Sequence, residues 1–382
     1  MNRQTGFDFD LAVDRRRTAS IKWDKYQGRD IIPLWVADMD FRSPPAILEA
    51  LHARIDHGVF GYTAAPETLV AAVIAHLEEQ YEWTIDPHWL VWLPGLVCGL
   101  NVACRAVGGT DDEVLTFTPI YPPFMTAPSL SGRAMVKVPL RLDGSRWEMD
   151  LEALERALTP RSRLFLLCNP HNPVGRVWSE TELLELAELA ARHELIICSD
   201  EIHAGLILDA DRRHLPLARL ATGIADRIIT FHAPSKTFNI PGLGCSFAVI
   251  ADQALRKSFT RAMAGIVPHV NLLGYAAAEA AYRHGEPWRR QLIEYLRGNR
   301  HLVLQAVAKM PGLSVTPVEA TYLAWIDTRE SGIDNPEGFF EQAGVGLSDG
   351  ADFGLPGFVR LNFGCPRPLL SEALKRMQRA LT

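Results

Sequence analysis

The sequence predicts an α/β fold in which a large domain holds a mostly parallel sheet between helices, followed by a small α+β domain. Through the middle of the chain, short apolar segments alternate with longer amphipathic segments. Strands that are apolar on both faces and alternate with helices are typical of a parallel sheet covered on two sides. The chain has 382 residues, which is too long for one small core and therefore favours two domains.

Six strands are expected in the large domain. The clearest helix between them is 180–193, where apolar residues recur at i, i+3 and i+4 spacing. In a sheet of this kind, ligands bind where loops leave the carboxyl ends of the strands. The expected strands are 90–93, 113–117, 163–167, 195–199, 227–231 and 246–250.

The two ends of the chain have a different character. Residues 1–44 are rich in Asp, Arg and aromatic residues and predict an arm that forms part of the small domain. A long helical pattern at 286–310 leads to strand patterns at 322–326 and 358–362 and then to a C-terminal helix. The expected units are the arm (1–44), a large domain (45–285) and a small domain (286–382), and the cleft between the domains is the expected site.

Composition and charge exclude several classes of protein. The chain has 39 Lys and Arg against 45 Asp and Glu, a net charge of −6, which disfavours a nucleic-acid partner. The first residues lack the apolar core of a signal peptide, and no apolar run reaches membrane-spanning length. The six cysteines form no CxxC pair and mostly lie in apolar runs, as buried free thiols do in a reducing cytosol. We therefore expect a cytoplasmic protein without a membrane partner.

Four polar side chains directly follow predicted strands: Asn172, Asp200, His203 and Lys236. Because the carboxyl ends of parallel strands meet at one edge of a sheet, we expect these groups to lie close together. Most have an ordinary structural explanation. Asn172 could form a turn, Asp200 could cap a helix, and Lys236 could be a solvated loop cation.

Lys236 is the hardest of the four to explain structurally. The chain has seven lysines against 32 arginines, and Lys236 lies between Ala-Pro-Ser and Thr-Phe-Asn-Ile. A lysine that loses its proton can form an imine, whereas an arginine cannot. The position therefore indicates an amine retained for its covalent chemistry.

Four segments carry a resemblance to a known family. Asn-Pro-His-Asn-Pro-Val-Gly at 169–175, Asp-Glu-Ile-His at 200–203 and Ser-Lys-Thr-Phe-Asn at 235–239 resemble the active-site series of fold-type I pyridoxal phosphate (PLP) enzymes. Leu-Trp-Val-Ala-Asp-Met-Asp-Phe at 34–41 is similar to the cystathionine β-lyase-like C–S lyases within the class I/II aminotransferase superfamily. The resemblance covers essentially the whole chain and implies a seven-stranded sheet.

The resemblance implies that PLP is the cofactor and assigns roles around its ring. Lys236 would bind the cofactor covalently and take the Cα proton of the substrate. Asp200 would pair with the pyridinium nitrogen and keep it protonated. Asn172 would donate a hydrogen bond to the ring's phenolate oxygen, and His203 stands near it where aminotransferases commonly have Tyr. Tyr121 would stack on the ring face.

The resemblance also implies how the phosphate and the substrate bind. The backbone amides of Leu96, Val97 and Cys98, the Ser235 hydroxyl and Tyr62 of a neighbouring subunit would hold the phosphate, so a homodimer is expected. Relatives often carry an Arg eight residues beyond the lysine, where this chain has Gly244. Arg360 would grip the substrate carboxylate, with Ala37, Asp38, Tyr121 and Asn172 on the substrate side.

Two features of the sequence resemble sites of other protein classes. Gly344-Val-Gly346 superficially resembles a dinucleotide loop, but the third glycine is misplaced. His203, His214 and His232 match no recognised metal-ligand spacing, so no metal is expected. The expected activity is α,β-elimination from L-cystathionine or a related cysteine thioether, giving thiol, pyruvate and ammonia. Transamination is the alternative, and a partner-binding regulator is a third possibility.

Overall fold

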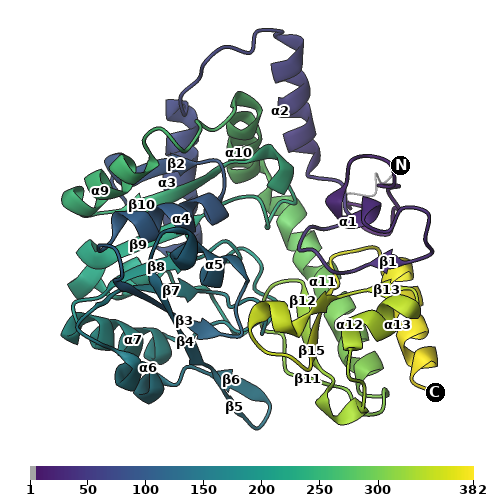
Figure 1. Cartoon of the computed structure of the whole chain (residues 1–382). Helices are drawn as coiled ribbons and strands as arrows, with labels where there is room; N and C mark the ends of the chain where they lie inside the picture. Colours follow the sequence, from purple (N-terminus) through teal and green to yellow (C-terminus); the bar gives the residue numbers. More distant parts are fainter. Residues whose placement is uncertain (1–5) are drawn as a thin grey trace.

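The chain, seen in a computed structural model, is described for residues 6–382, and its two larger β-sheets have seven and four strands (Figure 1). In the seven-stranded sheet, every strand runs parallel to the others except β10, which is antiparallel to both of its neighbours. This confirms the mostly parallel sheet of the predicted fold. In spatial order the strands are β2 (Leu90–Leu93), β10 (Ser246–Ile250), β9 (Ile228–His232), β8 (Ile196–Asp200), β7 (Ser162–Cys168), β3 (Glu113–Thr118) and β4 (Ala134–Pro139).

Strand β4 is the member of this sheet that was not expected from the sequence. It lies at the edge, pairs only with β3, and keeps most of its side chains partly exposed. Lys137 projects from its middle, so the segment lacks the continuous apolar run by which the central strands were found. The other six strands were predicted to within about two residues of their ends.

Helices cover both faces of the seven-stranded sheet because side chains alternate along each strand. On β10, Ala248 and Ile250 pack with α4 (Leu96–Ala106), α5 (Pro123–Leu130) and α9 (Gln253–Met263). Phe247 and Val249 face the other way, toward α3 (Glu67–Tyr81) and α10 (Leu272–His284). That second face is continued by α6 (Leu151–Ala157), α7 (Glu180–Arg192) and α8 (Leu217–Leu220).

Helix α7 illustrates how local sequence defines an element. The Ser179 side chain accepts from the backbone N–H of Glu182, and the Glu182 side chain accepts from the backbone N–H of Ser179. This capping box satisfies donors that a helix N-terminus otherwise leaves unpaired. The helix ends at Arg192, one residue before the predicted end.

The four-stranded sheet is antiparallel, and all of its strands come from the last hundred residues of the chain. It follows the long helix α11 (Glu286–Val307), which ends three residues before the predicted end. The strand order is β11 (Ser314–Val315), β12 (Leu323–Asp327), β15 (Phe358–Asn362) and β14 (Ser348–Asp349), with α12 (Pro336–Gln342) and α13 (Arg367–Ala380) beside it.

The N-terminal segment packs with this C-terminal sheet. Strand β1 (Ile32–Pro33) pairs in parallel with β13 (Val345–Gly346), and Leu34 lies in the same apolar cluster as α11 and α13. The packing supports an arm that joins the small domain, although the exact domain boundaries stay a prediction. Residues 1–5 of the predicted arm lie outside the described residues.

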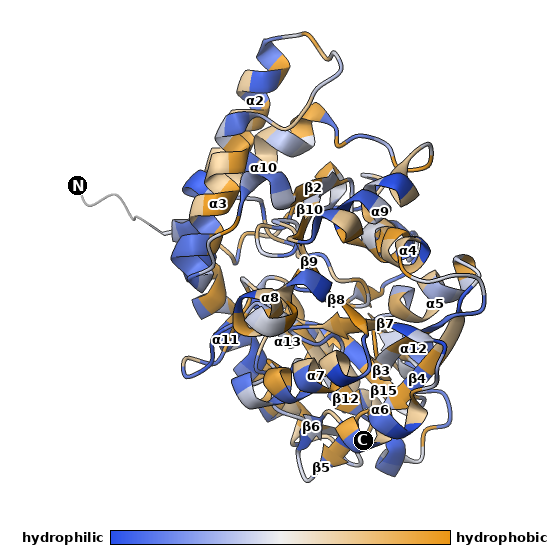
Figure 2. Ribbon diagram, turned by 90° about the vertical axis from the view of Figure 1, so that its left-hand side faces the viewer, coloured by the Kyte–Doolittle hydropathy of each residue, from blue (hydrophilic) through white to orange (hydrophobic). Residues whose placement is uncertain are grey.

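Helix α2 (Pro45–Asp56) packs against α10, and its C-terminal end and the connection to α3 project from the rest of the molecule in both views (Figures 1 and 2). The remaining α-helix and strands are short: helix α1 (Ile21–Asp24) and the hairpin of β5 (Arg141–Asp143) and β6 (Arg146–Glu148). Within residues 6–382, no helix combines the length and the apolarity needed to cross a membrane. All six cysteines are free thiols, and all but Cys98 are buried.

Candidate active site

The predicted site residues meet in a cavity of about 240 Å³ at the carboxyl ends of β7, β8 and β9. The start of α4, the arm segment at 36–37 and strand β15 complete its wall. The cavity therefore lies between the seven-stranded sheet and the C-terminal sheet, as the sequence predicted. The predicted residues that line it are Ala37, Leu96, Val97, Tyr121, Asn172, Asp200, His203, Ser235, Lys236 and Arg360.

Lys236 points its amine at the arm. Its Nζ donates to the Ala37 carbonyl oxygen at 2.6 Å, and the Tyr322 hydroxyl donates to the same oxygen at 2.9 Å. Burial, together with the positive charge of Arg360, lowers the pKa of Lys236 to about 8. An amine with this pKa is neutral in about a tenth of molecules at pH 7. The neutral amine is the form that attacks a carbonyl.

Asp200 ends strand β8 inside the cavity and is buried. No helix follows it directly, so it does not cap one; its Oδ1 instead accepts from the backbone N–H of Ile202 at 3.1 Å. Burial raises the pKa of Asp200 to about 7, and the neighbouring carboxylate of Glu201 adds to the rise. A cation placed against this carboxyl would reverse the shift, so the residue is poised to pair with a positively charged group.

Arg360 reaches the cavity from strand β15. It donates from Nη1 to Oδ1 of Asn172 at 3.1 Å and from Nη2 to the Trp35 carbonyl at 2.8 Å. Its buried Nε has no hydrogen-bond partner among the described residues. Burial lowers the pKa of Arg360 to about 10, and an anionic ligand would relieve that cost. The bond to Asn172 also leaves the amide NH₂ of Asn172 as the end that can donate.

His203 and Tyr121 supply rings to the cavity wall. His203 is buried, and its Nδ1 has no partner among residues 6–382. Burial lowers the pKa of His203 to about 3, so its imidazole is neutral and can donate from one nitrogen. Tyr121 is half-buried, and its backbone N–H donates to the Asn172 carbonyl at 3.2 Å.

The start of helix α4 forms another part of the wall. Leu96 and Val97 line the cavity with Ser235, whereas Cys98 is half-buried outside the lining. Gly244, eight residues beyond Lys236, has φ +59°. A Cβ there would lie 3.1 Å from the Pro94 carbonyl oxygen, so the backbone favours glycine at this turn.

Comparison with known proteins decides the family. The family described as aminotransferase class I and II matches residues 29–377. The chain belongs to this family. It is 37% identical to the cystathionine β-lyase PatB of Bacillus subtilis strain 168, over 98% of this chain and all of that protein.

Solved structures agree with this membership. The structure of OvoB has a TM-score of 0.96 and 49% identity, covering 98% of this chain and 99% of that one. Cystalysin of Treponema denticola, which contains PLP, has a TM-score of 0.95 and 32% identity, covering 98% of both chains. The predicted fold type is confirmed, and the cofactor of the family is PLP.

The residues present fit this cofactor. An amine, a buried carboxyl group and a buried neutral imidazole with an unpartnered nitrogen, from Lys236, Asp200 and His203, converge on one cavity. These are the groups that a pyridine ring bearing an aldehyde and an oxygen substituent requires. The first backbone N–H groups of α4 are suited to an anion such as the phosphate.

Some residues of the site were not found by sequence reasoning. Tyr322 shares the Ala37 oxygen with Lys236, and Trp35 receives a hydrogen bond from Arg360 through its carbonyl. Trp35 belongs to the 34–41 segment that carries the family resemblance, but no role was expected for it, and Tyr322 lies in no motif. Tyr322 begins the predicted strand 322–326 and resembles any core aromatic, and Trp35 contributes only a backbone atom.

Asp38 lies next to the cavity but does not line it. Arg15 donates to its carboxylate at 2.6 and 3.0 Å, and the buried Lys22 bonds the Asp38 carbonyl at 3.1 Å. Lys22 also bonds Asp40 at 2.8 Å. These charges fasten the segment that carries Ala37, and they explain Asp38 structurally. Lys22, although it belongs to the charged arm, is fully buried.

Tyr62 is not brought to the cavity within one chain. It is fully exposed in the connection between α2 and α3, near the exposed side chains of Val59 and Phe60. Its predicted contact with the phosphate therefore requires a second copy of the chain.

Proposed function

We propose that this chain is a PLP-dependent C–S β-lyase that cleaves L-cystathionine or a related L-cysteine thioether into a thiol, pyruvate and ammonia. The observation that carries the proposal is the convergence of Lys236, Asp200 and Arg360 on one cavity. It is supported by full-length similarity to a cystathionine β-lyase.

The proposed cofactor contacts follow from the cavity wall. Bound PLP supplies an electron sink that stabilises negative charge at Cα of an amino acid. Asp200 would hold a proton on the ring nitrogen, and Tyr121 would flank the ring. Asn172 and His203 would donate to the ring oxygen. The first amides of α4, at Leu96, Val97 and Cys98, would bind the phosphate with Ser235 and with Tyr62 of a neighbouring subunit.

The proposed chemistry belongs to Lys236 and Arg360. Arg360 would bind the substrate carboxylate with two parallel N–H donors and so orient the Cα–H bond toward the lysine. Lys236, with its lowered pKa, would remove the Cα proton as a neutral amine. Its ammonium could then deliver that proton to the departing sulfur. Ala37, whose carbonyl already accepts from Nζ, would hold the amine on the substrate side.

One experiment separates elimination from transamination, which the family also contains. The PLP-bound enzyme is incubated with L-cystathionine and no keto acid. We expect free thiol, pyruvate and ammonia over many turnovers, because elimination regenerates the cofactor. Reaction that stops after one turnover and resumes only when a keto acid is added would establish the aminotransferase instead.

Covalent attachment is tested separately. Borohydride treatment of the yellow holoenzyme should fix the cofactor to Lys236, and Lys236→Ala should lose both this label and the lyase activity. A biological effect that survives Lys236→Ala would favour the regulator. A colourless chain that takes up no added PLP would overturn the proposal.

We also propose a homodimer with shared sites and a cytoplasmic location. The exposed Val59, Phe60 and Tyr62 support the first, because they form an apolar segment at a projecting connection. Six free cysteines support the second, because thiols persist in reducing compartments.

A further inference from the structure

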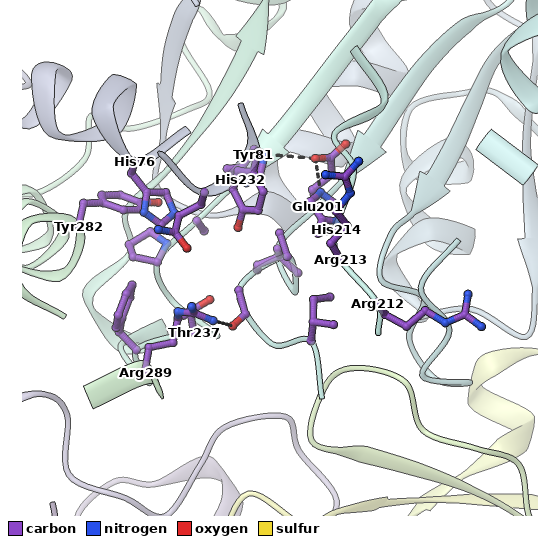
Figure 3. Close-up of a pocket in the computed structure, with 18 residues that line it drawn as sticks. His76, Tyr81, Glu201, Arg212, Arg213, His214, His232, Thr237, Tyr282 and Arg289 are labelled. Carbon is purple, nitrogen blue, oxygen red and sulfur yellow. Dashed lines mark hydrogen bonds and ion pairs between the residues drawn. The ribbon is translucent and has the colours of Figure 1, made fainter. Parts of the chain in front are cut away.

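A second cavity, of about 190 Å³, lies next to the active-site cavity and shares Ile202 and Ala233 with it. Its wall brings together Glu201, His214 and His232 (Figure 3). Glu201 follows strand β8, His214 comes from the loop before α8, and His232 ends strand β9. All three are at least 95% buried. The mechanism proposed above uses none of them.

The three side chains present a compact set of ligand atoms. Oε2 of Glu201 lies 2.7 Å from Nε2 of His214 and 3.2 Å from Nε2 of His232. One atom from each residue can be chosen so that all lie within 4.8 Å of one another. Two ligand atoms on a tetrahedral Zn²⁺ are about 3.3 Å apart, given metal–ligand distances of about 2.0 to 2.2 Å. The 3.2 Å separation between Glu201 and His232 already matches this value. The 2.7 Å separation between Glu201 and His214 needs to open by about half an ångström.

A hydrogen-bonded Glu–His pair explains only part of this cluster. Nε2 of His214 is paired with Glu201, whereas its buried Nδ1 has no partner among the described residues. The buried Nε2 of His232 also makes no hydrogen bond there, despite lying 3.2 Å from the carboxylate. A buried nitrogen without a partner is costly. A cation between the three groups would use its lone pair.

The surroundings hold Glu201 in an orientation suited to a ligand. Its Oε1 accepts from the Ser199 hydroxyl at 2.9 Å and from the backbone N–H of Leu217 at 3.1 Å. The other oxygen is thereby directed at the two imidazoles, as outer hydrogen bonds orient metal ligands. The cavity leaves room for water as a fourth ligand.

We propose that Glu201, His214 and His232 bind one divalent transition-metal ion of the Zn²⁺ type. Two imidazoles and one carboxylate with an open fourth position are a known zinc ligand set. The ion would tie the long loop that carries His214 to the ends of β8 and β9. It would also place positive charge beside Glu201, the residue next to Asp200.

The proposal is tested by metal content, which is independent of lyase activity. The PLP-bound chain, made without a histidine tag, is stripped with EDTA, equilibrated with Zn²⁺ and freed of unbound metal by gel filtration. We expect about one zinc per chain. His232→Phe and Glu201→Gln should each bind zinc at least tenfold more weakly. Zinc should raise the melting temperature of the parent chain but not that of either variant.

His88→Ala is the matched control, because it removes an exposed histidine and should leave zinc binding unchanged. Circular dichroism checks that each variant is folded. If His232→Phe does not fold, Glu201→Gln still tests the proposal, because it retains the shape of the glutamate side chain. Equal zinc content in the parent chain and a folded variant, or no bound zinc in the parent chain, would overturn the proposal. Loss of lyase activity alone would bear only on the proposed function.

Discussion

Three side chains of the active site carry charges that burial disfavours. The pKa of Asp200 is raised to about 7, that of Lys236 is lowered to about 8 and that of Arg360 is lowered to about 10, in each case chiefly because of burial. Burying these three ionisable groups in one cavity costs free energy as long as no ligand is bound there. Bound cofactor and substrate would relieve this cost, since each brings a group of opposite charge.

Asp200 yields a prediction with a defined sign. In the cofactor-free chain its pKa lies above the unfolded value of 3.8, so its neutral form stabilises the fold fully below about pH 4. That contribution is lost as the pH rises toward 7, up to about 4 kcal/mol for a shift of about three units. Asp200→Asn should therefore match the parent chain near pH 4 and exceed its free energy of unfolding near pH 7. Urea denaturation at both pH values measures this, and a difference that does not change with pH would contradict it. In the PLP-bound protein the same variant should bind the cofactor more weakly.

At the scale of elements, the arm is held by a buried cluster of charged side chains, because its strand β1 pairs with β13 over only two residues. Lys22 and Asp40 are both buried and lie 2.8 Å apart, and Arg15 adds a second cation to Asp40 at 2.7 Å. Opposite charges hold the pKa of Asp40 below its usual value despite its burial. The cluster thus positions the segment that ends at Ala37 against Lys236.

Removing one member of that cluster should be costly. Lys22→Ala leaves the Asp40 carboxylate with less compensation and should cost about 3 to 5 kcal/mol of unfolding free energy. Lys25→Ala is the control, because Lys25 is exposed and lies 3.7 Å from Glu337, and it should cost less than about 1 kcal/mol. Denaturant melts of both variants measure the difference, and equal losses would show that the cluster does not secure the arm.

The turn that precedes strand β10 gives a second prediction at this scale. Gly244→Ala forces a side chain into a left-handed conformation, with its Cβ 3.1 Å from the Pro94 carbonyl, and should cost about 1 to 2 kcal/mol. Gly242→Ala meets open space without a positive φ and should be nearly neutral. Comparable melting temperatures for the two variants would contradict this account of Gly244.

At the scale of the whole molecule, the proposed homodimer can be tested at Tyr62, in the exposed connection after α2. If Tyr62 serves the site of a second copy, Tyr62→Ala and Lys236→Ala damage opposite sides of each shared site. When the two variants are mixed under conditions that exchange subunits, each mixed dimer should have one intact site. Because about half of the dimers are then mixed, about a quarter of the parent activity should return. Activity that stays at the average of the two variants would show that the sites are not shared.

The sequence was sufficient where the signal was local. The central strands are recognisable as apolar runs, and α7 carries its own capping box. Asn172, Asp200 and Lys236 follow strands whose carboxyl ends meet in any parallel sheet. The edge strand β4 was missed because an exposed strand loses that apolar continuity. Tyr322 and Lys22 were missed because their partners lie 285 and 18 residues away, and no local pattern marks such a contact.

By itself, therefore, the sequence determined the fold class, the family resemblance and the residues that would carry the chemistry, because these depend on side-chain type and on order along the chain. Only the tertiary structure decided which groups face one another. It turned Asp38 toward Arg15 and kept Tyr62 away from the cavity of its own chain. It also joined Glu201 to His214 and His232, whose spacing matches no metal pattern in sequence. The reason is physical: hydrogen bonds and metal ligation act over a few ångströms, and folding sets those distances between residues far apart in the chain.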